Sequence, residues 1–381
     1  MGSNPRFVLS LCNAGMGCVA LGASLVPVYL TTLGAAFGAL DASELGRIPA
    51  LVFAGFVVGI LGTGPLADRY GARPFVLLGM ALSASGLLLL AASTGYIMLL
   101  GAALLIGLGA GVIDMVMSPI VSALSIADRT TALNRLHAYY CVGAIGTLVV
   151  ASVMLRLGAP WRVVVGAFAS IPAAVFVGFL LVALPPLVHP DAPRQGLRSL
   201  IFLPRFHLAL VGMVLVGATE EGMAQWLPAY AERALGFRKT TAALGLMGFA
   251  TAMGLGRLLA ARLEGKWSGP QLLFSGALWC GAGFLVAALS PVPSVALAGC
   301  VAVGFGASVL WPTSLARCAD TFPQGGATLF AALAAAGNGG CLAAPLLCGY
   351  LVEYGGLRVA MGVGSLYPLT LAVIIALTAR R

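Results

Sequence analysis

Long runs of apolar residues dominate this chain, and short polar or glycine-rich stretches separate them. A run of about 20 apolar residues forms a helix long enough to cross the ~30 Å hydrocarbon layer of a membrane. Twelve runs have this length, so we predict an all-α integral membrane protein with 12 transmembrane helices. The predicted helices span residues 7–33, 44–64, 74–94, 96–126, 134–156, 162–184, 207–232, 240–262, 270–290, 294–318, 325–351 and 357–379.

The longest polar interruption lies near the middle of the chain, where prolines and basic residues fill the stretch from Pro185 to Arg205. It separates six predicted helices from six. This pattern predicts an N-terminal six-helix bundle over 1–184, a cytoplasmic linker over 185–206 and a C-terminal six-helix bundle over 207–381.

The two predicted bundles share details of sequence. An offset of 197 places residues 107–114 (GLGAGVID) on residues 304–311 (GFGASVLW). In the first helix of each half, an offset of 201 places residues 26–29 (VPVY) on residues 227–230 (LPAY). Parallel repeats of this kind are typical of transporters, whose binding site lies between the halves near the membrane midplane. We therefore expect two pseudo-symmetric six-helix bundles.

Composition and charge agree with a membrane protein. Hydrophobic residues make up 60% of the chain and charged residues only 9%, well below the quarter that is typical of a soluble domain. Of the 21 lysines and arginines, 14 fall on the side that holds both termini and 21 − 14 = 7 on the other. This bias predicts cytoplasmic termini in the inner (plasma) membrane. Membrane topology also explains the net charge of +9 better than a nucleic-acid partner does.

A charged segment punctuated by glycine, residues 64–73 (GPLADRYGAR), connects the second and third predicted helices. It resembles the cytoplasmic loop signature of the major facilitator superfamily, and the resemblance implies a transporter that works by alternating access. An aspartate here can pair with an arginine or with a helix N-terminus and hold the inner side closed. The alternative is that the arginines only set the topology. The predicted cytoplasmic gate consists of Gly64, Asp68, Arg69, Gly71 and Arg73.

Three acidic residues fall well inside predicted helices, away from the helix ends, where an ionisable side chain is costly and normally faces a cavity. Asp114 lies near the middle of the fourth helix, and Glu220 and Glu221 are neighbours in the seventh. A glutamate six residues before a tryptophan resembles sugar transporters and favours Glu220, whereas the internal repeat favours Glu221. We predict that all three take part in proton coupling, and the choice within the pair stays open.

The glycines and the acid of residues 107–114, followed by Asn134, His137 and Gly143, resemble the fucose:proton symporter branch and its glucose-transporting relatives. The resemblance implies that Asp114 couples proton and sugar movement. Two departures are Ser118, where the branch has asparagine, and a first helix without an acidic residue. Side chains suited to sugar hydroxyls and ring faces give the predicted substrate site, which consists of Asn13, Ser24, Asp114, His137, Tyr140, Gln225, Trp226, Trp311 and Asn338.

We weigh three classes of function against these patterns. A proton-coupled symporter of a small polar solute such as a sugar fits best, and a proton-driven efflux antiporter for drugs or amphipathic organic solutes is the alternative. An enzyme is disfavoured, because the sequence lacks a catalytic set, a phosphate loop and a metal-ligand cluster. We expect a monomer in the lipid bilayer with a small-molecule substrate, no cofactor, no metal, and H⁺ as the coupling ion, with Na⁺ left open. The eight cysteines are expected in the core.

Overall fold

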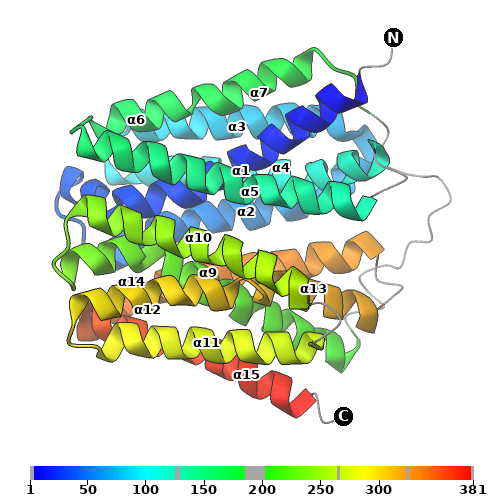
Figure 1. Cartoon of the computed structure of the whole chain (residues 1–381). Helices are drawn as coiled ribbons and strands as arrows, with labels where there is room; N and C mark the ends of the chain where they lie inside the picture. The colour runs from blue at the N-terminus through cyan, green and yellow to red at the C-terminus, as the bar shows by residue number, and fades with distance from the viewer. Residues whose placement is uncertain (1–3, 125–128, 185–201, 264–266, 323–325, 379–381) are drawn as a thin grey trace. The chain divides into compact units, whose positions relative to one another are not determined.

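The computed structural model describes residues 4–124, 129–184, 202–263, 267–322 and 326–378. The chain is folded as a succession of helices (Figure 1), which confirms the predicted all-α class. In the first half these are α1 (Pro5–Ala36), α2 (Ala42–Tyr70), α3 (Ala72–Ala92), α4 (Tyr96–Leu124), α5 (Arg129–Arg156), α6 (Trp161–Phe168) and α7 (Ser170–Leu180). In the second half they are α9 (Pro204–Arg233), α10 (Lys239–Leu263), α11 (Gly269–Leu289), α12 (Pro293–Ala307), α13 (Leu310–Thr321), α14 (Gly326–Gly364) and α15 (Leu366–Thr378).

Some membrane crossings consist of two helices in line. α6 and α7 are separated only by Ala169, and α12 and α13 only by Ser308 and Val309. Within the described ranges, eleven stretches are long and apolar enough to cross a membrane, and the last of them, Ala331–Thr378, is 48 residues long. A helix of that length would measure roughly 72 Å, more than twice the hydrocarbon thickness. This stretch therefore holds two crossings, in agreement with the predicted number of 12.

The turn between the last two crossings depends on Gly356. Its backbone has φ 78°, in the left-handed region that glycine adopts without steric cost. The sequence predicted a break after residue 351, but helical geometry continues to Gly355 because residues 352–354 are compatible with a helix. The final crossing therefore begins directly after a turn centred on one residue.

Contacts between Cα atoms divide the chain into two compact units. Unit 1 comprises Met1–Tyr29 and Leu51–Pro193, and unit 2 comprises Leu30–Ala50 and Arg194–Arg381. The end of α1 and the beginning of α2 thus pack with the helices of unit 2. The predicted bundles 1–184 and 207–381 stay a prediction, and residues 185–201 of the predicted linker lie outside the described residues.

An arginine clamp occurs in both halves of the chain. Arg162, at the start of α6, donates from Nη1 to the carbonyl oxygens of Ala91 at 2.8 Å and Ser93 at 2.6 Å, at the end of α3. In the second half Arg358 donates from Nη1 to the carbonyl oxygens of Ala288 at 3.3 Å and Ser290 at 2.6 Å, at the end of α11. The acceptors are separated by 288 − 91 = 197 and 290 − 93 = 197 positions, and the arginines by 358 − 162 = 196. The repeat seen in the sequence therefore carries the same three-dimensional contact.

Close packing between helices repeats at the same offset. A Cβ on Gly107 would lie 1.7 Å from the carbonyl oxygen of Val52, and a Cβ on Gly304 would lie 2.3 Å from that of Phe249. Both pairs differ by 197, since 304 − 107 = 197 and 249 − 52 = 197. Glycine is required at these positions because any side chain would collide with the backbone of the neighbouring helix. Such contacts hold helices together in lipid, where burial of apolar surface gives no driving force.

We predict that Arg162→Met and Arg358→Met each lower the thermal stability of the folded protein. Each change leaves two carbonyl groups at a helix end without their charged donor, and one hydrogen bond to a charged group contributes about 1.5–3 kcal/mol. A thiol-reactive fluorescent dye can follow unfolding, because seven of the eight cysteines are buried and Cys141 is partly exposed.

The matched control is Arg156→Met, which removes an exposed arginine at the end of α5. It should leave the unfolding temperature close to that of the wild type. Equal shifts for Arg156→Met and the two clamp variants would show that the clamps contribute nothing specific.

Candidate transport site

In unit 1, Asp114 lies in the middle of α4 and is partly buried. α4 is pressed against α2, because a Cβ on Gly111 would lie only 2.1 Å from the carbonyl oxygen of Phe56. His137 on α5 is exposed and acts electrostatically on the Asp114 carboxylate. The structure thus brings together two predicted site residues that are distant in the sequence, and a carboxylate beside an imidazole can exchange a proton.

The helices that carry other predicted residues of unit 1 pack beside this pair. A Cβ on Gly143 of α5 would lie 2.5 Å from the carbonyl oxygen of Gly17 on α1, so these helices touch backbone to backbone. On α1, Asn13 is partly buried and Ser24 is buried, and Tyr140 of α5 is partly buried. The structure places these three side chains on helices adjacent to one another.

In unit 2, two adjacent carboxylates on α9 have different neighbours. Glu221 is buried, and its Oε2 accepts a hydrogen bond of 2.7 Å from Nε2 of the buried Gln225. Arg257 of α10 attracts the Glu220 carboxylate, whereas the groups acting on Glu221 are the Glu220 carboxylate and the neutral amide of Gln225. Glu220 therefore has a cationic neighbour, and Glu221 has a neutral one.

Sequence reasoning did not identify Arg257 as a neighbour of Glu220. The available signal was its position within the predicted helix 240–262, where an arginine needs a partner. Its partner could not be identified from sequence, because Glu220 lies on another helix.

The two carboxylates lie beside the interface between α9 and α14. A Cβ on Gly217 would lie 2.0 Å from the carbonyl oxygen of Gly337 and 2.9 Å from Sγ of Cys341, and both carboxylates act electrostatically on Cys341. On α14, the buried Asn338 donates a hydrogen bond of 2.9 Å from Nδ2 to the carbonyl oxygen of Ala334. Gly337 also contacts the indole ring of the partly buried Trp311 from α13, since a Cβ there would lie 2.4 Å from that ring.

Trp226 has a packing partner. Its side chain is 1% exposed, and its indole Nε1 donates to the carbonyl oxygen of Pro345 on α14 at 3.0 Å. The ring therefore fastens α9 to α14, and its role toward a substrate stays a prediction.

The predicted gate segment turns between α2 and α3 at Gly71, whose φ of 79° is left-handed. Arg73 Nη2 donates to the carbonyl oxygen of Leu180 at 2.8 Å, which ties this turn to the end of α7. The Arg69 guanidinium lies 5.3 Å from the centre of the Tyr70 ring. Gly64 is partly buried in α2, and the side chain of Asp68 lies outside the described residues.

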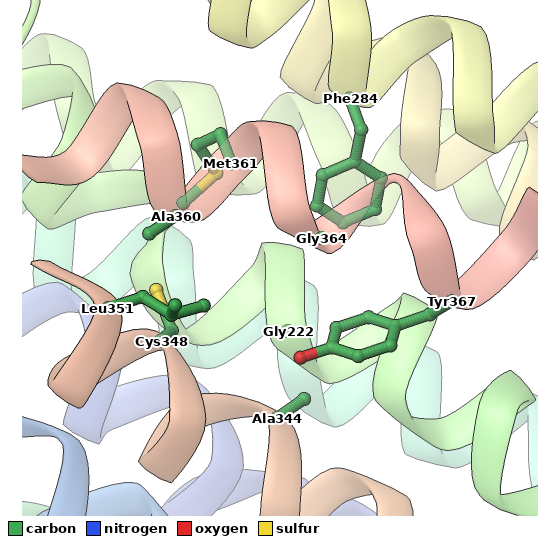
Figure 2. A pocket seen from close by; sticks show the side chains of 9 residues that line it. All are labelled: Gly222, Phe284, Ala344, Cys348, Leu351, Ala360, Met361, Gly364 and Tyr367. Atoms are coloured by element: carbon green, nitrogen blue, oxygen red, sulfur yellow. The ribbon is translucent and has the colours of Figure 1, made fainter. Parts of the chain in front are cut away.

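A small pocket in unit 2 has a mostly apolar lining (Figure 2). It contains about 250 Å³ of empty space, part of it open to the surroundings. Its lining consists of Gly222, Phe284, Ala344, Cys348, Leu351, Ala360, Met361, Gly364 and Tyr367. The Tyr367 ring reaches from α15 toward Gly222 and Ala344, and its hydroxyl is the only side-chain oxygen of this lining. A polar solute needs several donors and acceptors, so the predicted substrate residues are the better candidate site.

The fold and these residues define a multi-pass membrane transporter. The family model of the Major Facilitator Superfamily matches residues 12–273 and 232–381. The chain therefore belongs to the major facilitator superfamily, a family of transporters and not of enzymes. Its place in the fucose:proton symporter branch stays a prediction.

Several known proteins are similar along most of the chain. An uncharacterized MFS-type transporter of Yersinia pestis is 27% identical over 369 residues, which cover 96% of this chain and 92% of that protein. An uncharacterized transporter of Sinorhizobium fredii is 26% identical over 355 residues, covering 87% and 88%.

Two solved structures show the same fold. A mutant form of the nucleoside transporter NupG has a TM-score of 0.81 and is 14% identical in sequence. The match covers 98% of this chain and 99% of the NupG chain. The D-xylose-proton symporter has a TM-score of 0.80 and 15% identity, covering 98% and 97%.

We predict that Gly71→Ala destabilises the connection between α2 and α3, because a residue with a Cβ is strained at φ 79° and ψ 168° by about 1–3 kcal/mol. The unfolding temperature should fall. Gly62→Ala in α2 is the matched control, since a Cβ at Gly62 would have nothing within 4 Å and alanine favours a helix. A fall of equal size in both variants would contradict a special requirement at Gly71.

Proposed function

We propose that the protein is a secondary active transporter that moves a small polar solute such as a sugar together with protons by alternating access. The observation that carries the proposal is Glu221, a carboxylate that is buried in α9 and hydrogen-bonded to the neutral Gln225. A buried carboxylate without a cationic partner is costly when ionised, and binding a proton removes that cost. The likeness to a D-xylose-proton symporter supports this class of function.

Asp114 provides a second coupling group in unit 1. His137 acts electrostatically on the Asp114 carboxylate, and an imidazole beside a carboxylate can exchange a proton with it. Glu220 is the third predicted coupling acid, and its carboxylate has Arg257 as a cationic neighbour. We therefore rank Asp114 and Glu221 ahead of Glu220.

The substrate would bind to polar side chains among those predicted from the sequence. The residues proposed for this role are Asn13, Ser24, Asp114, His137, Tyr140, Gln225, Trp311 and Asn338. Amide and carboxylate groups match the hydroxyls of a sugar, and the indole face of Trp311 matches the C–H face of a sugar ring. We further propose that both termini are cytoplasmic in the plasma membrane, that the protein acts as a monomer, and that the segment Gly64–Arg73 with Asp68 closes the inner side.

Reconstituted protein provides the direct test of coupling. In proteoliposomes, Asp114→Asn and Glu221→Gln should abolish proton movement driven by substrate, while exchange of labelled substrate across the membrane continues. Coupling needs a group that takes up and releases a proton, whereas exchange needs only the binding site. A pH-sensitive dye inside the vesicles measures the first quantity, and radiolabelled sugar measures the second.

Glu44→Gln is the matched control for that experiment, because Glu44 lies at the start of α2 as a helix cap and glutamine preserves this role. It should keep the coupling of the wild type. Persistent coupling in both the Asp114 and the Glu221 variants would exclude these residues as the coupling groups. If substrate transport instead required Na⁺ and moved no protons, we would assign the carboxylates as ligands of Na⁺.

The substrate class can be tested by thermal unfolding in the presence of sugars, nucleosides, amino acids and amphipathic cations. A ligand at 100 times its dissociation constant stabilises the folded state by about 2.7 kcal/mol. We expect a sugar to raise the unfolding temperature and the Gln225→Leu variant to lose this effect. A shift given only by amphipathic compounds would contradict the sugar assignment.

A proton-driven efflux antiporter for amphipathic solutes is the second candidate. The Organic cation/carnitine transporter 7 of Arabidopsis thaliana is 30% identical over 184 residues, covering 47% of this chain and 36% of that protein. A carboxylate beside a neutral amide, as in Glu221, also suits an organic cation. In inverted vesicles an antiporter would dissipate a proton gradient when an organic cation is added, and a sugar symporter would not.

A further inference from the structure

The Glu220 carboxylate and the Arg257 guanidinium are two opposite charges in unit 2 to which the proposed function assigns no main role. Coupling is assigned first to Asp114 and Glu221, and neither member of the pair is among the proposed sugar contacts. Both residues lie inside membrane crossings, Glu220 in Pro204–Arg233 and Arg257 in Lys239–Ala260. A charged side chain at such a place is costly and normally serves a function.

Arg257 lies on the buried side of α10. Leu246 and Met253 are buried, and the spacings 253 − 246 = 7 and 257 − 253 = 4 place Arg257 on the same side of the helix. Leu255 and Leu258 are exposed on the remaining surface. The Arg257 side chain is itself partly buried. It therefore belongs to the interior side of α10 and not to its exposed apolar side.

The two charged residues are offset from each other along their helices. A Cβ on Gly245 of α10 would lie 3.1 Å from Cδ2 of Leu227 on α9, which shows how these helices are aligned. Counted from this contact toward the start of α9 and the end of α10, Glu220 is 227 − 220 = 7 residues away and Arg257 is 257 − 245 = 12. At 1.5 Å per residue, their Cα atoms are offset by about 8 Å along the helices.

The Glu220 carboxylate has no direct partner within the part of the chain that the structure describes. Arg257 attracts it electrostatically, but no hydrogen bond or ion pair to its oxygens is formed there. The other titratable groups that interact with it are Glu221 on its own helix, Cys280 on α11 and Cys341 on α14.

This open arrangement differs from that of a structural ion pair. Inside a membrane, an ion pair offsets the loss of water only in direct contact and with good hydrogen bonds. Glu220 and Arg257 attract each other without such contact, and both side chains are only partly buried. The arrangement therefore leaves room for a ligand between the two charges.

The signs of the charges select the ligand. A cation that binds Glu220 is repelled by Arg257, and an anion that binds Arg257 is repelled by Glu220. A zwitterion satisfies both groups, because its ammonium donates hydrogen bonds to the carboxylate and its carboxylate accepts two from the guanidinium. Its net charge is zero, so its movement needs no work against the membrane potential.

We propose that Glu220 and Arg257 bind a zwitterionic solute, with its ammonium group at Glu220 and its carboxylate at Arg257. The zwitterion is a further ligand beside the proposed sugar, and the proposal rests on the proposed function only in that the protein transports small polar solutes. The offset between the two residues favours a solute whose charged groups are several bonds apart over an α-amino acid.

The test measures how tightly the purified full-length protein binds ω-amino acids of increasing length, from glycine through β-alanine and γ-aminobutyrate to 6-aminohexanoate. Dissociation constants follow from the dependence of the unfolding temperature on ligand concentration. One length above that of glycine should bind most tightly, because both charges must be met at once. The amine and the carboxylic acid of that length should bind about 10- to 100-fold more weakly, as the loss of one charge-assisted contact predicts.

Variants assign each contact. Arg257→Gln should no longer distinguish the best zwitterion from its amine, and Glu220→Gln should no longer distinguish it from its acid. Arg257→Lys keeps the positive charge and should restore part of the preference for the zwitterion. Arg238→Gln is the matched control, because it removes an exposed arginine directly before α10, and it should keep the wild-type order of affinities.

The proposal is wrong if no ω-amino acid binds the wild-type protein, or if the zwitterion and its singly charged analogues bind equally well. It is also wrong if Arg257→Gln and Arg238→Gln give the same order of affinities. The analogue series needs only the wild type, so it decides the matter even where a variant does not fold. These results do not depend on proton coupling by Asp114 or Glu221 or on sugar binding, so the proposed function and the zwitterion site can fail separately.

Discussion

A backbone polar group in hydrocarbon has no water to pair with, and the architecture of both units follows from this constraint. Continuous helices pair most groups internally, but every helix end leaves carbonyl or amide groups exposed. The clamps of Arg162 and Arg358 satisfy such ends, and Glu353 does the same for the start of α2. Helices that are capped in this way can then pack by direct backbone contact, which explains why glycine is placed at Gly107 and Gly304.

The halves share a framework but have diverged in detail. The Tyr230 hydroxyl donates to the carbonyl oxygen of Ala287, at the end of α11. In the first half the corresponding carbonyl, that of Leu90, accepts from Oγ of Ser93 at 2.7 Å. The buried Tyr29 hydroxyl has no hydrogen-bond partner among the described residues. The same divergence occurs among the candidate site residues, since Asp114 has Trp311 as its counterpart across the repeat.

Features that depend on one stretch of chain were predictable from sequence. The length of each apolar run indicated the 12 crossings. Segment 64–73 was expected to connect the second and third helices, but α2 continues to Tyr70 and the connection is Gly71 alone. Partners from distant helices were not predictable, because periodicity does not specify which faces meet. The attraction between Glu220 and Arg257 and the bond from Trp226 to Pro345 belong to this second group.

The single-glycine turns have a practical consequence. α2 and α3 are joined only by Gly71, and α14 reverses at Gly356 within two residues of the Arg358 clamp. At these places the protein presents helix ends to the water and almost no loop. An antibody fragment or a fused marker domain would have little to recognise there, and an insertion would disturb the left-handed glycine that makes the turn. A handle for imaging or purification is therefore better attached to a chain end than to either turn.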